Sequence, residues 1–259
     1  MHAKLFETYF DVVTADSGPL LDEVFRLRHQ IYCDELGFEP QRANCLEHDE
    51  YDKRSVHCLL FHKASKTFIG CSRLILADVN EPGEPFPFET ACGESFRWSF
   101  GGSAEPGRAR YGEISRLAVI AKFRRFPRDE VAVADGAGED FYDGDENEKH
   151  LFPMISLGLY LAMTAIVLNK GLKGVYAMME PRLARRLRRL GILFKQVGEA
   201  VEHHGLRGPF LVDCDAILNT LKPDCRALLG KIQYSLVMPH AQRHESALSV
   251  GVNTPSLVQ

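Results

Sequence analysis

The sequence lacks any cysteine arrangement that points to a disulfide framework or a zinc site. Its seven cysteines are an odd number and include no C-x-x-C pair. This pattern is more typical of buried thiols in a reducing compartment than of disulfides or metal ligands. The chain also does not open with a basic segment followed by an apolar one. We therefore expect no signal peptide, no bound metal and a cytoplasmic protein.

Long uncharged runs are scarce as well. Residues 151–168 carry no charge, but the run is barely the ~18 residues that a membrane span needs. Its apolar character is also interrupted, at Pro153, Ser156, Gly158 and Thr164. We interpret the run as a buried helix and expect no membrane span.

An excess of positive charge is also missing, since the net charge is -4 and the isoelectric point is about 6.2. This balance argues against a dedicated nucleic-acid binder. The charge is unevenly distributed, because residues 129–149 contain nine acidic residues and one lysine. We interpret about 127–150 as an exposed acidic insertion and 238–259 as a flexible tail. With 259 residues, 45% of them hydrophobic, the chain can bury a substantial core, and we expect one domain over residues 1–237.

The most informative stretch is YGEISRLAVIAKFRR, residues 111–125. Its apolar density predicts a strand buried on both faces. Glu113, Ser115 and Arg116 interrupt this strand, and burying such groups is costly unless they are paired or functional. The residue types alone leave both alternatives open, a structural Glu–Arg pair and a working site.

The rest of the chain predicts helices and strands on both sides of this strand. Ser17 is expected to cap a helix that runs to about Glu35, with Arg28 beside its apolar stripe, either reaching solvent or entering a cleft. The polar loop that follows would by itself be interpreted as a solvated acidic loop. The other predicted elements are strands at 6–13, 56–63, 67–76, 174–179, 194–198 and 208–212, and a helix opened by Pro181.

This element order resembles that of the GNAT acyltransferase superfamily, with an α/β (α+β) fold in which helices flank a mixed, mostly antiparallel central sheet. Four motifs resemble acyl-homoserine-lactone (autoinducer) synthases and related N-acyl amino acid synthases. They are FRLRHQIYCDELGF, EHDEYD, GCSRLIL and EISRLAV, which occur in that order from residue 25 to residue 119. Most of the chain is also similar to acyltransferases associated with PEP-CTERM/exosortase systems.

The resemblance implies a set of functional positions in this sequence. It marks Glu113, Ser115 and Arg116 as catalytic. Asp49 and Asp52 would pair with arginines and frame an acceptor pocket. The implied substrate-binding residues are Arg28, Tyr32, Phe38, Asp49, Asp52 and Arg73.

Two departures from the family pattern bear on the substrates. Phe38 stands where autoinducer synthases usually carry tryptophan, which argues against S-adenosylmethionine as the acceptor. The central strand is followed by AKFRRF rather than by a glycine-rich turn whose N–H groups could cradle a pyrophosphate. An acyl-phosphopantetheine thioester on an acyl carrier protein (ACP) therefore fits better than acyl-CoA, and no bound cofactor is expected.

The expected reaction is transfer of a long-chain acyl group from a thioester to the amine of a small acceptor, such as an amino acid. Glu113 would take the amine proton. Backbone N–H groups near residues 117–119 would stabilise the oxyanion. Arg28, Arg73 and Arg116 would hold an acceptor carboxylate. Ser115 would either protonate the leaving thiolate or hold Glu113.

Two other functions stay open at this stage. One is a true acyl-homoserine-lactone synthase. The other is a non-catalytic acyl- or metabolite-binding module, although such a module has no need of a base at Glu113. A basic helix is the expected docking face for an acidic acyl carrier protein, with a merely solvated basic helix as the alternative. Its docking residues would be Arg182, Arg185, Arg186 and Arg189.

Overall fold

The computed structural model describes residues 2–78, 80–81, 83–93, 107–124 and 152–237. Within these residues eight strands form one sheet in the order β1-β2-β3-β4-β5-β8-β6, with β7 paired to β8. All neighbouring strands are antiparallel except β4 and β5. The strands are β1 (Phe10–Thr14), β2 (Ser55–His62), β3 (Thr67–Leu76), β4 (Tyr111–Val119), β5 (Gly174–Met179), β6 (Phe194–Gln196), β7 (Val201–Glu202) and β8 (Leu206–Asp213).

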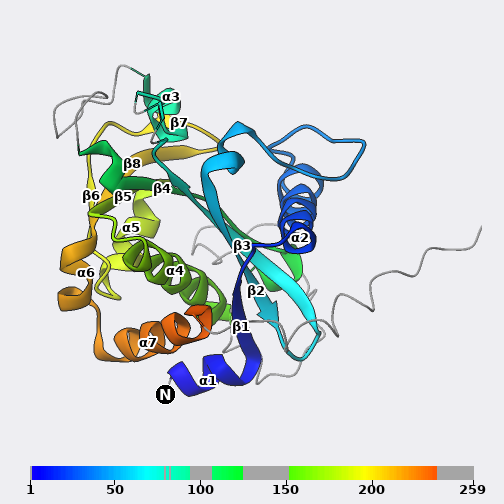
Figure 1. The fold of residues 1–259 in the computed structure, drawn as a ribbon, viewed down its shortest axis with the longest axis vertical. Helices are drawn as coiled ribbons and strands as arrows, with labels where there is room; N and C mark the ends of the chain where they lie inside the picture. The colour runs from blue at the N-terminus through cyan, green and yellow to red at the C-terminus, as the bar shows by residue number, and fades with distance from the viewer. Residues whose placement is uncertain (1, 79, 82, 94–106, 125–151, 238–259) are drawn as a thin grey trace, which may run out of the picture.

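Helices flank both faces of this sheet (Figure 1). One face is covered mainly by α4, α7 and α1, and the other by α2 with its π-helical continuation, by the loop after it and by α3. The α-helices are α1 (His2–Tyr9), α2 (Gly18–Arg28), α3 (Pro87–Cys92), α4 (Phe152–Asn169), α5 (Pro181–Arg188), α6 (Cys214–Thr220) and α7 (Pro223–Val237), and a π-helix follows α2 over His29–Glu35.

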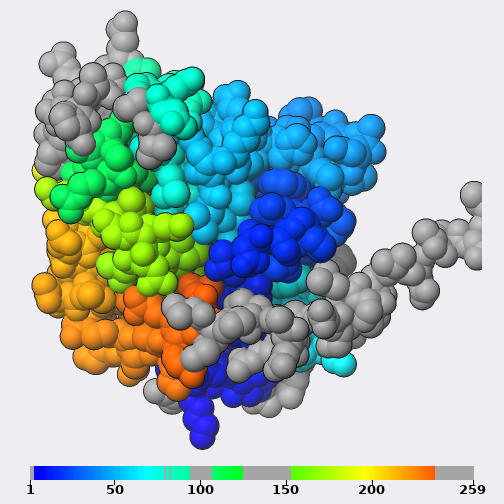
Figure 2. Space-filling view, viewed as in Figure 1, coloured from blue at the N-terminus to red at the C-terminus, as the bar shows by residue number. Residues whose placement is uncertain are grey.

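Alternation along the strands assigns each side chain to one face. Leu60 and Leu74 pack on the α4 side, whereas Leu59 and Cys71 pack against α2. Arg73 precedes Leu74 and so points toward the α2 side. In the space-filling view, the segment from α2 to the end of the acidic loop (blue to light blue) lies on the right, and α4 and α7 lie to its left (Figure 2). Among the charged residues on the α2 side, Arg28, Glu47 and Arg73 are buried.

The fold confirms the predicted mixed, mostly antiparallel sheet flanked by helices, with β4 as a central strand. The predicted buried helix is α4, and no described helix is long and apolar enough to cross a membrane. All seven cysteines are free and only Cys45 is exposed, as expected for buried thiols. The acidic insertion and the tail both lie wholly outside the described residues.

Some predicted boundaries were wrong. Residues 6–9 belong to α1 and not to the first strand, because pairing with β2 begins at Phe10 opposite His62. The Phe6 ring instead packs beside the Phe10 ring, with the centroids 5.4 Å apart and the planes tilted by 38°. The predicted helix after Ser17 is present, but Ser17 makes no side-chain cap hydrogen bond and the last turns are π-helical.

Candidate active site

A buried cluster of arginines and carboxylates lies between α2, β3 and the acidic loop. Arg28 donates from Nε to Glu47 and from Nη1 to Asp52 Oδ1 at 2.7 Å. Nη1 of Arg73 donates to the same Asp52 oxygen at 2.6 Å and to Asp49 Oδ1 at 2.5 Å. Burial disfavours the charged form of Asp52, but the two guanidinium groups outweigh burial and lower the pKa of Asp52 to about 2. Both arginines are therefore held by carboxylates of the chain itself.

The acidic loop is ordered by its own hydrogen bonds as well as by these arginines. Asp49 Oδ1 accepts from the backbone N–H of Tyr51 at 3.0 Å, and Asp52 Oδ2 accepts from the N–H of Asp49 at 2.8 Å. These bonds form a capping box on a 3-10 helix over Glu50–Arg54. The interpretation of this loop as merely solvated is therefore wrong, and the implied pairing of Asp49 and Asp52 with arginines is present.

The environment of Arg28 and Arg73 differs from what the sequence suggested. Both side chains are buried, at 0% and 1% exposure, and their donors face the acidic loop. Arg28 therefore neither reaches solvent nor lines an open cleft. The predicted binding of an acceptor carboxylate does not use the hydrogen bonds seen for these two arginines, because those bonds hold Asp49 and Asp52 in place.

A backbone irregularity in β4 brings two consecutive polar residues to the same face. The β3–β4 register shifts between Cys71 and Arg73, so that Arg116 and Leu117 lie opposite Ser72 alone. Arg116 has a positive φ of 50°, which is unusual for a residue with a side chain. This bulge lets both Ser115 and Arg116 project toward the α2 side, where alternation would allow only one of them.

Both residues make contacts there. Ser115 Oγ accepts a hydrogen bond from Arg73 Nε at 3.0 Å. Arg116 Nη2 donates to Glu39 at 2.7 Å and to Glu47 at 3.1 Å. The Arg116 guanidinium also lies over the Tyr32 ring, 5.1 Å from its centroid. Because Arg116 pairs with these acids, the alternative of a structural Glu113–Arg116 pair is wrong.

Glu113 is the exception in this charged region. It is 2% exposed, and its Oε2 accepts a hydrogen bond from the N–H of Phe88 at 3.0 Å. Among the described residues it has no ion-pair partner within 4.0 Å. Burial disfavours its charge more strongly than the Phe88 N–H and Arg73 favour it, which raises its pKa to about 8. A carboxyl group with such a pKa is suited to exchanging protons near neutral pH.

Glu113 lines a polar cavity of about 250 Å³. Glu39 and Asp49 provide further carboxylates, and Phe38 stacks on His204 with ring centroids 4.5 Å apart. Further polar side chains come from β3, β4 and the β7–β8 hairpin. They are Arg73, Ser115, Arg116, His203, His204 and Arg207.

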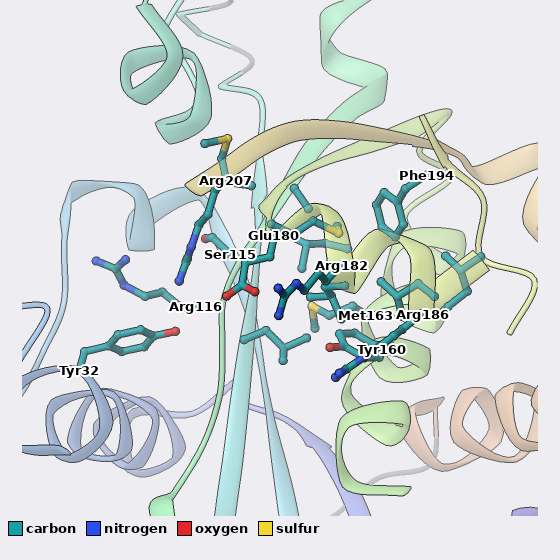
Figure 3. A pocket seen from close by; sticks show the side chains of 18 residues that line it. Tyr32, Ser115, Arg116, Tyr160, Met163, Glu180, Arg182, Arg186, Phe194 and Arg207 are labelled. Atoms are coloured by element: carbon teal, nitrogen blue, oxygen red, sulfur yellow. The ribbon is translucent and has the colours of Figure 1, made fainter. Parts of the chain in front are cut away.

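A second, largely apolar cavity of about 470 Å³ lies where β4 and β5 separate. The two strands pair only up to Ile114 and Ala177, although both continue beyond these residues. Their separation leaves a space between the strands, α4 and α5 (Figure 3). Its apolar lining includes Leu117, Met163, Met178, Met179, Leu183, Leu187, Ile192 and Phe194.

The cavities meet at shared residues. Ser115 and Arg116 line both the polar and the apolar cavity. Tyr32 and Arg207 line these two and also a third cavity of about 600 Å³ near the end of β4. A molecule in the polar cavity and a chain in the apolar one would thus meet beside Ser115. Among the described residues, no cluster of three or more His, Cys, Asp or Glu side chains could hold a metal ion.

The structure brings together most of the predicted site residues. The polar cavity is lined by the three catalytic candidates and also by Tyr32, Phe38, Asp49 and Arg73. Arg28 and Asp52 lie behind this cavity. The predicted docking residues are separate from this group, on exposed positions of α5 and just after it, although Arg182 and Arg186 also line the apolar cavity. Sequence reasoning missed Glu39, Glu47, His203, His204 and Arg207. Of these only Glu47 carried a signal, as the first residue of EHDEYD.

The sequence is also similar to known proteins. Residues 27–133 match the family model described as an acetyltransferase (GNAT) domain. An acyl-homoserine-lactone synthase from Aeromonas salmonicida is 25% identical over 189 residues, covering 72% of this chain and 76% of the relative.

Solved structures share the fold. The CoA-dependent acyl-homoserine-lactone synthase BjaI, with SAM and isopentyl-CoA, has a TM-score of 0.57 at 18% identity, covering 88% of this chain and 91% of BjaI. The N-acyl amino acid synthase FeeM, from uncultured soil microbes, has a TM-score of 0.50 at 10% identity, covering 82% and 94%. Residues 27–133 therefore match a GNAT acetyltransferase domain, the chain is similar to acyl-homoserine-lactone synthases, and these matches support an N-acyltransferase enzyme.

Proposed function

We propose that the enzyme transfers a long-chain acyl group from an acyl-carrier-protein or CoA thioester to the amine of a small acceptor, in particular an amino acid. The observation that carries this proposal is the state of Glu113. Its carboxyl group is buried and free of any ion pair among the described residues, has a pKa of about 8, and lines a polar cavity that adjoins an apolar one. This arrangement suits a general base for an amine that attacks a thioester.

The two cavities fit the two substrates. The polar cavity of about 250 Å³ is smaller than typical sites for drug-sized ligands, so it suits a small acceptor. The apolar cavity of about 470 Å³, lined by methionine, leucine and phenylalanine side chains, suits an acyl chain. Ser115 lies on both walls, so the thioester carbonyl would lie close to it.

In the proposed reaction the acceptor nitrogen attacks the thioester carbonyl carbon while its proton passes to Glu113, directly or through a water. Backbone N–H groups near residues 117–119, just after the bulge, would stabilise the oxyanion. The C–S bond then breaks as the amide is completed. The leaving thiolate takes a proton from the Ser115 hydroxyl, and the proton held by Glu113 passes back to Ser115, directly or through a water, so that both groups return to their starting states. The Ser115 oxygen accepts a hydrogen bond from Arg73. Asp49, Asp52 and the arginines that bind them would shape the acceptor cavity.

The donor side is proposed to dock on α5. Arg185 and Arg189 are exposed, and Arg182 and Arg186 combine exposure with a place in the lining of the apolar cavity. An acidic carrier protein bound at this helix could therefore deliver its acyl chain into that cavity. An acyl-carrier donor would also fit a cytoplasmic location.

The resemblance to PEP-CTERM/exosortase-associated acyltransferases suggests a role beside such a system. Deletion of the gene in a bacterium that carries an exosortase tests this role. Impaired processing of PEP-CTERM proteins would support it, and unchanged processing would contradict it.

The function is tested by incubating the protein with a panel of acyl-carrier proteins and acyl-CoAs plus pooled amino acids, with products followed by mass spectrometry. We expect loss of the thioester coupled to an N-acyl product, and loss of this product in Glu113→Gln. Thioester binding without turnover would instead support a binding module.

An acyl-homoserine-lactone synthase is the second candidate, favoured by the Aeromonas relative and by BjaI. It would consume S-adenosylmethionine in the same assay. Phe38 packs against His204 at the position where those synthases usually have tryptophan, which is why we place this function second. Formation of an acyl-homoserine lactone with no N-acyl amino acid would reverse this order.

A further inference from the structure

Arg207 contributes a guanidinium group to the site, although it lies outside the four sequence motifs. It is the second residue of β8, directly after the β7–β8 turn that carries His203 and His204. Its side chain extends into the cavity toward the side where Tyr32 and Arg116 lie (Figure 3). Arg207 and Tyr32 are shared by all three cavities. Arg207 is therefore positioned to touch a substrate at the junction.

The hydrogen-bonding capacity of Arg207 is not used by the described part of the chain. Its Nε–H is buried without a hydrogen-bond partner there, and no carboxylate in that part lies within ion-pair distance of its guanidinium. The other arginines of the polar cavity differ in this respect, since Arg73 pairs with Asp49 and Asp52, and Arg116 pairs mainly with Glu39 and Glu47. A buried guanidinium donor without a partner is costly, so an anion in this position would be bound favourably.

The surroundings of Arg207 are electropositive. The Nε–H of Arg116 is also buried and without a partner in the described residues. The pKa of His203 is lowered, by partial burial first and then by His204, Arg207 and Arg116, although Glu39 opposes this shift. Of the carboxylates that line this cavity, Glu39 pairs with Arg116 and Asp49 with Arg73, and neither lies within ion-pair distance of Arg207.

We propose that Arg207 binds the carboxylate of an amino-acid acceptor and thereby directs the acceptor amine toward Glu113. This assignment rests on the proposed N-acyltransferase function and replaces Arg28 and Arg73 as the expected carboxylate ligands. A planar guanidinium matches a carboxylate with two parallel hydrogen bonds, and the Arg116 Nε–H adds a further donor nearby. Recognition by charge makes the acceptor an amino acid rather than a neutral amine.

The test compares L-amino acids with the corresponding L-amino acid amides as acceptors, at a fixed saturating thioester donor. For the wild type we expect the amides to have a KM about 10- to 100-fold higher than the acids, the range of one lost charge-assisted pair. In Arg207→Gln the KM for acids should rise to that of the amides, while the KM for amides and for the donor stays unchanged. Arg207→Lys should restore part of the preference. Arg226→Gln, at an exposed position of α7, is the matched control.

Other results would overturn the assignment. An equal loss with acids and amides would mean that Arg207 supports the fold or the chemistry generally. A raised donor KM with an unchanged acceptor KM would assign Arg207 to the thioester or its phosphate. If the wild type forms no N-acyl product, the proposed function fails, and binding of the same acceptors is measured by calorimetry. Binding of acids but not amides, lost in Arg207→Gln, would still support the carboxylate site, and no such difference would refute it.

Discussion

Glu113→Gln is the substitution that tests the proposed chemistry most directly. Glutamine keeps the shape of the side chain and an oxygen that can accept from the Phe88 N–H, now at 3.0 Å from Glu113 Oε2. What it removes is the ability to take a proton. General-base catalysis contributes roughly 10²- to 10⁴-fold, so we expect kcat to fall by about that factor while the KM for the donor stays unchanged.

The pH dependence gives a sharper test than the size of the loss. With a pKa of about 8, only a minor fraction of Glu113 is ionised at pH 7, and that fraction increases up to and beyond pH 8. The acceptor amine also loses its proton as the pH rises, but it does so equally in both proteins. The ratio of wild-type to Glu113→Gln kcat/KM should therefore rise about tenfold per pH unit well below pH 8 and level off above it. Initial rates of N-acyl product formation between pH 6 and 9.5 measure this ratio.

The same pKa shift has a consequence for stability. The folded pKa of about 8 lies above the ordinary value of 4.5 expected in the unfolded chain, so the folded state retains the proton over this interval. The contribution of Glu113 to the free energy of unfolding is therefore greatest below pH 4.5, falls as the pH rises toward 8, and is level above pH 8. At pH 7 the loss is on the order of 3 kcal/mol. Urea unfolding should thus show that Glu113→Gln gains on the wild type as the pH increases from 5 to 8.

Glu199→Gln removes a charge from an exposed position and is the control. The ratio of wild-type to Glu199→Gln kcat/KM, and the difference between their free energies of unfolding, should not change with pH. A kcat/KM ratio that is flat between pH 6 and 9.5 would refute the assignment of Glu113 as the base. Full activity in Glu113→Gln would do the same. A stability difference that does not change with pH would instead contradict the raised pKa.

Three other predictions follow from the buried charges and from α5. Arg28→Met should lower the unfolding free energy by about 3–5 kcal/mol, because Glu47 and Asp52 each lose one of their two arginine partners, Glu47 keeping only Arg116 and Asp52 only Arg73; urea unfolding measures this, and a loss below 1 kcal/mol would contradict it. Asp52→Asn should move the Glu113 limb of the activity profile to lower pH, since Arg73 loses one of its two carboxylates; an unmoved limb would count against this coupling. The double substitution Arg185→Gln, Arg189→Gln should raise the KM for acyl-carrier donors about 3- to 10-fold at low salt but not for acyl-CoA; equal changes for both donors, or none, would reject docking at α5.

Much of the fold could be predicted because several strands are continuous apolar runs bounded by turn residues, which is a clear sequence signal for a buried strand. The hairpin of β2 and β3 and the strand β5 lie within a residue or two of the predicted ranges. The failures have local causes. The apolar residues of 2–9 serve a short helix as well as they would serve a strand, since Phe6 reaches the core from α1. The π-helical turns after Arg28 have no recognisable sequence pattern.

The sequence predicted most residues of the candidate site, but not the ion pairs and hydrogen bonds between them. Four motifs pointed to residues that the fold brings together, because each motif is local to one strand, helix or loop. Which arginine pairs with which carboxylate depends on the bulge at Arg116 and on the path of the loop, and neither is encoded in spacing. Arg207 was missed for a related reason. It belongs to a strand that reaches the site through sheet order, with β8 beside β5 and far from the motifs in sequence.

The ion pairs between these arginines and the acidic loop also explain why Glu113 can act as a base in a region so rich in arginine. A buried cluster of this kind contributes little net stability, because removing the charges from water costs about as much as their pairing returns. Its effect is instead electrostatic, since the acids of the loop occupy the guanidinium groups of Arg28 and Arg73. If Arg73 were unpaired it would stabilise the Glu113 carboxylate and lower its pKa. By holding the arginines, the acidic loop leaves burial as the dominant influence on Glu113, so its pKa stays in the range where a base can both take and release a proton.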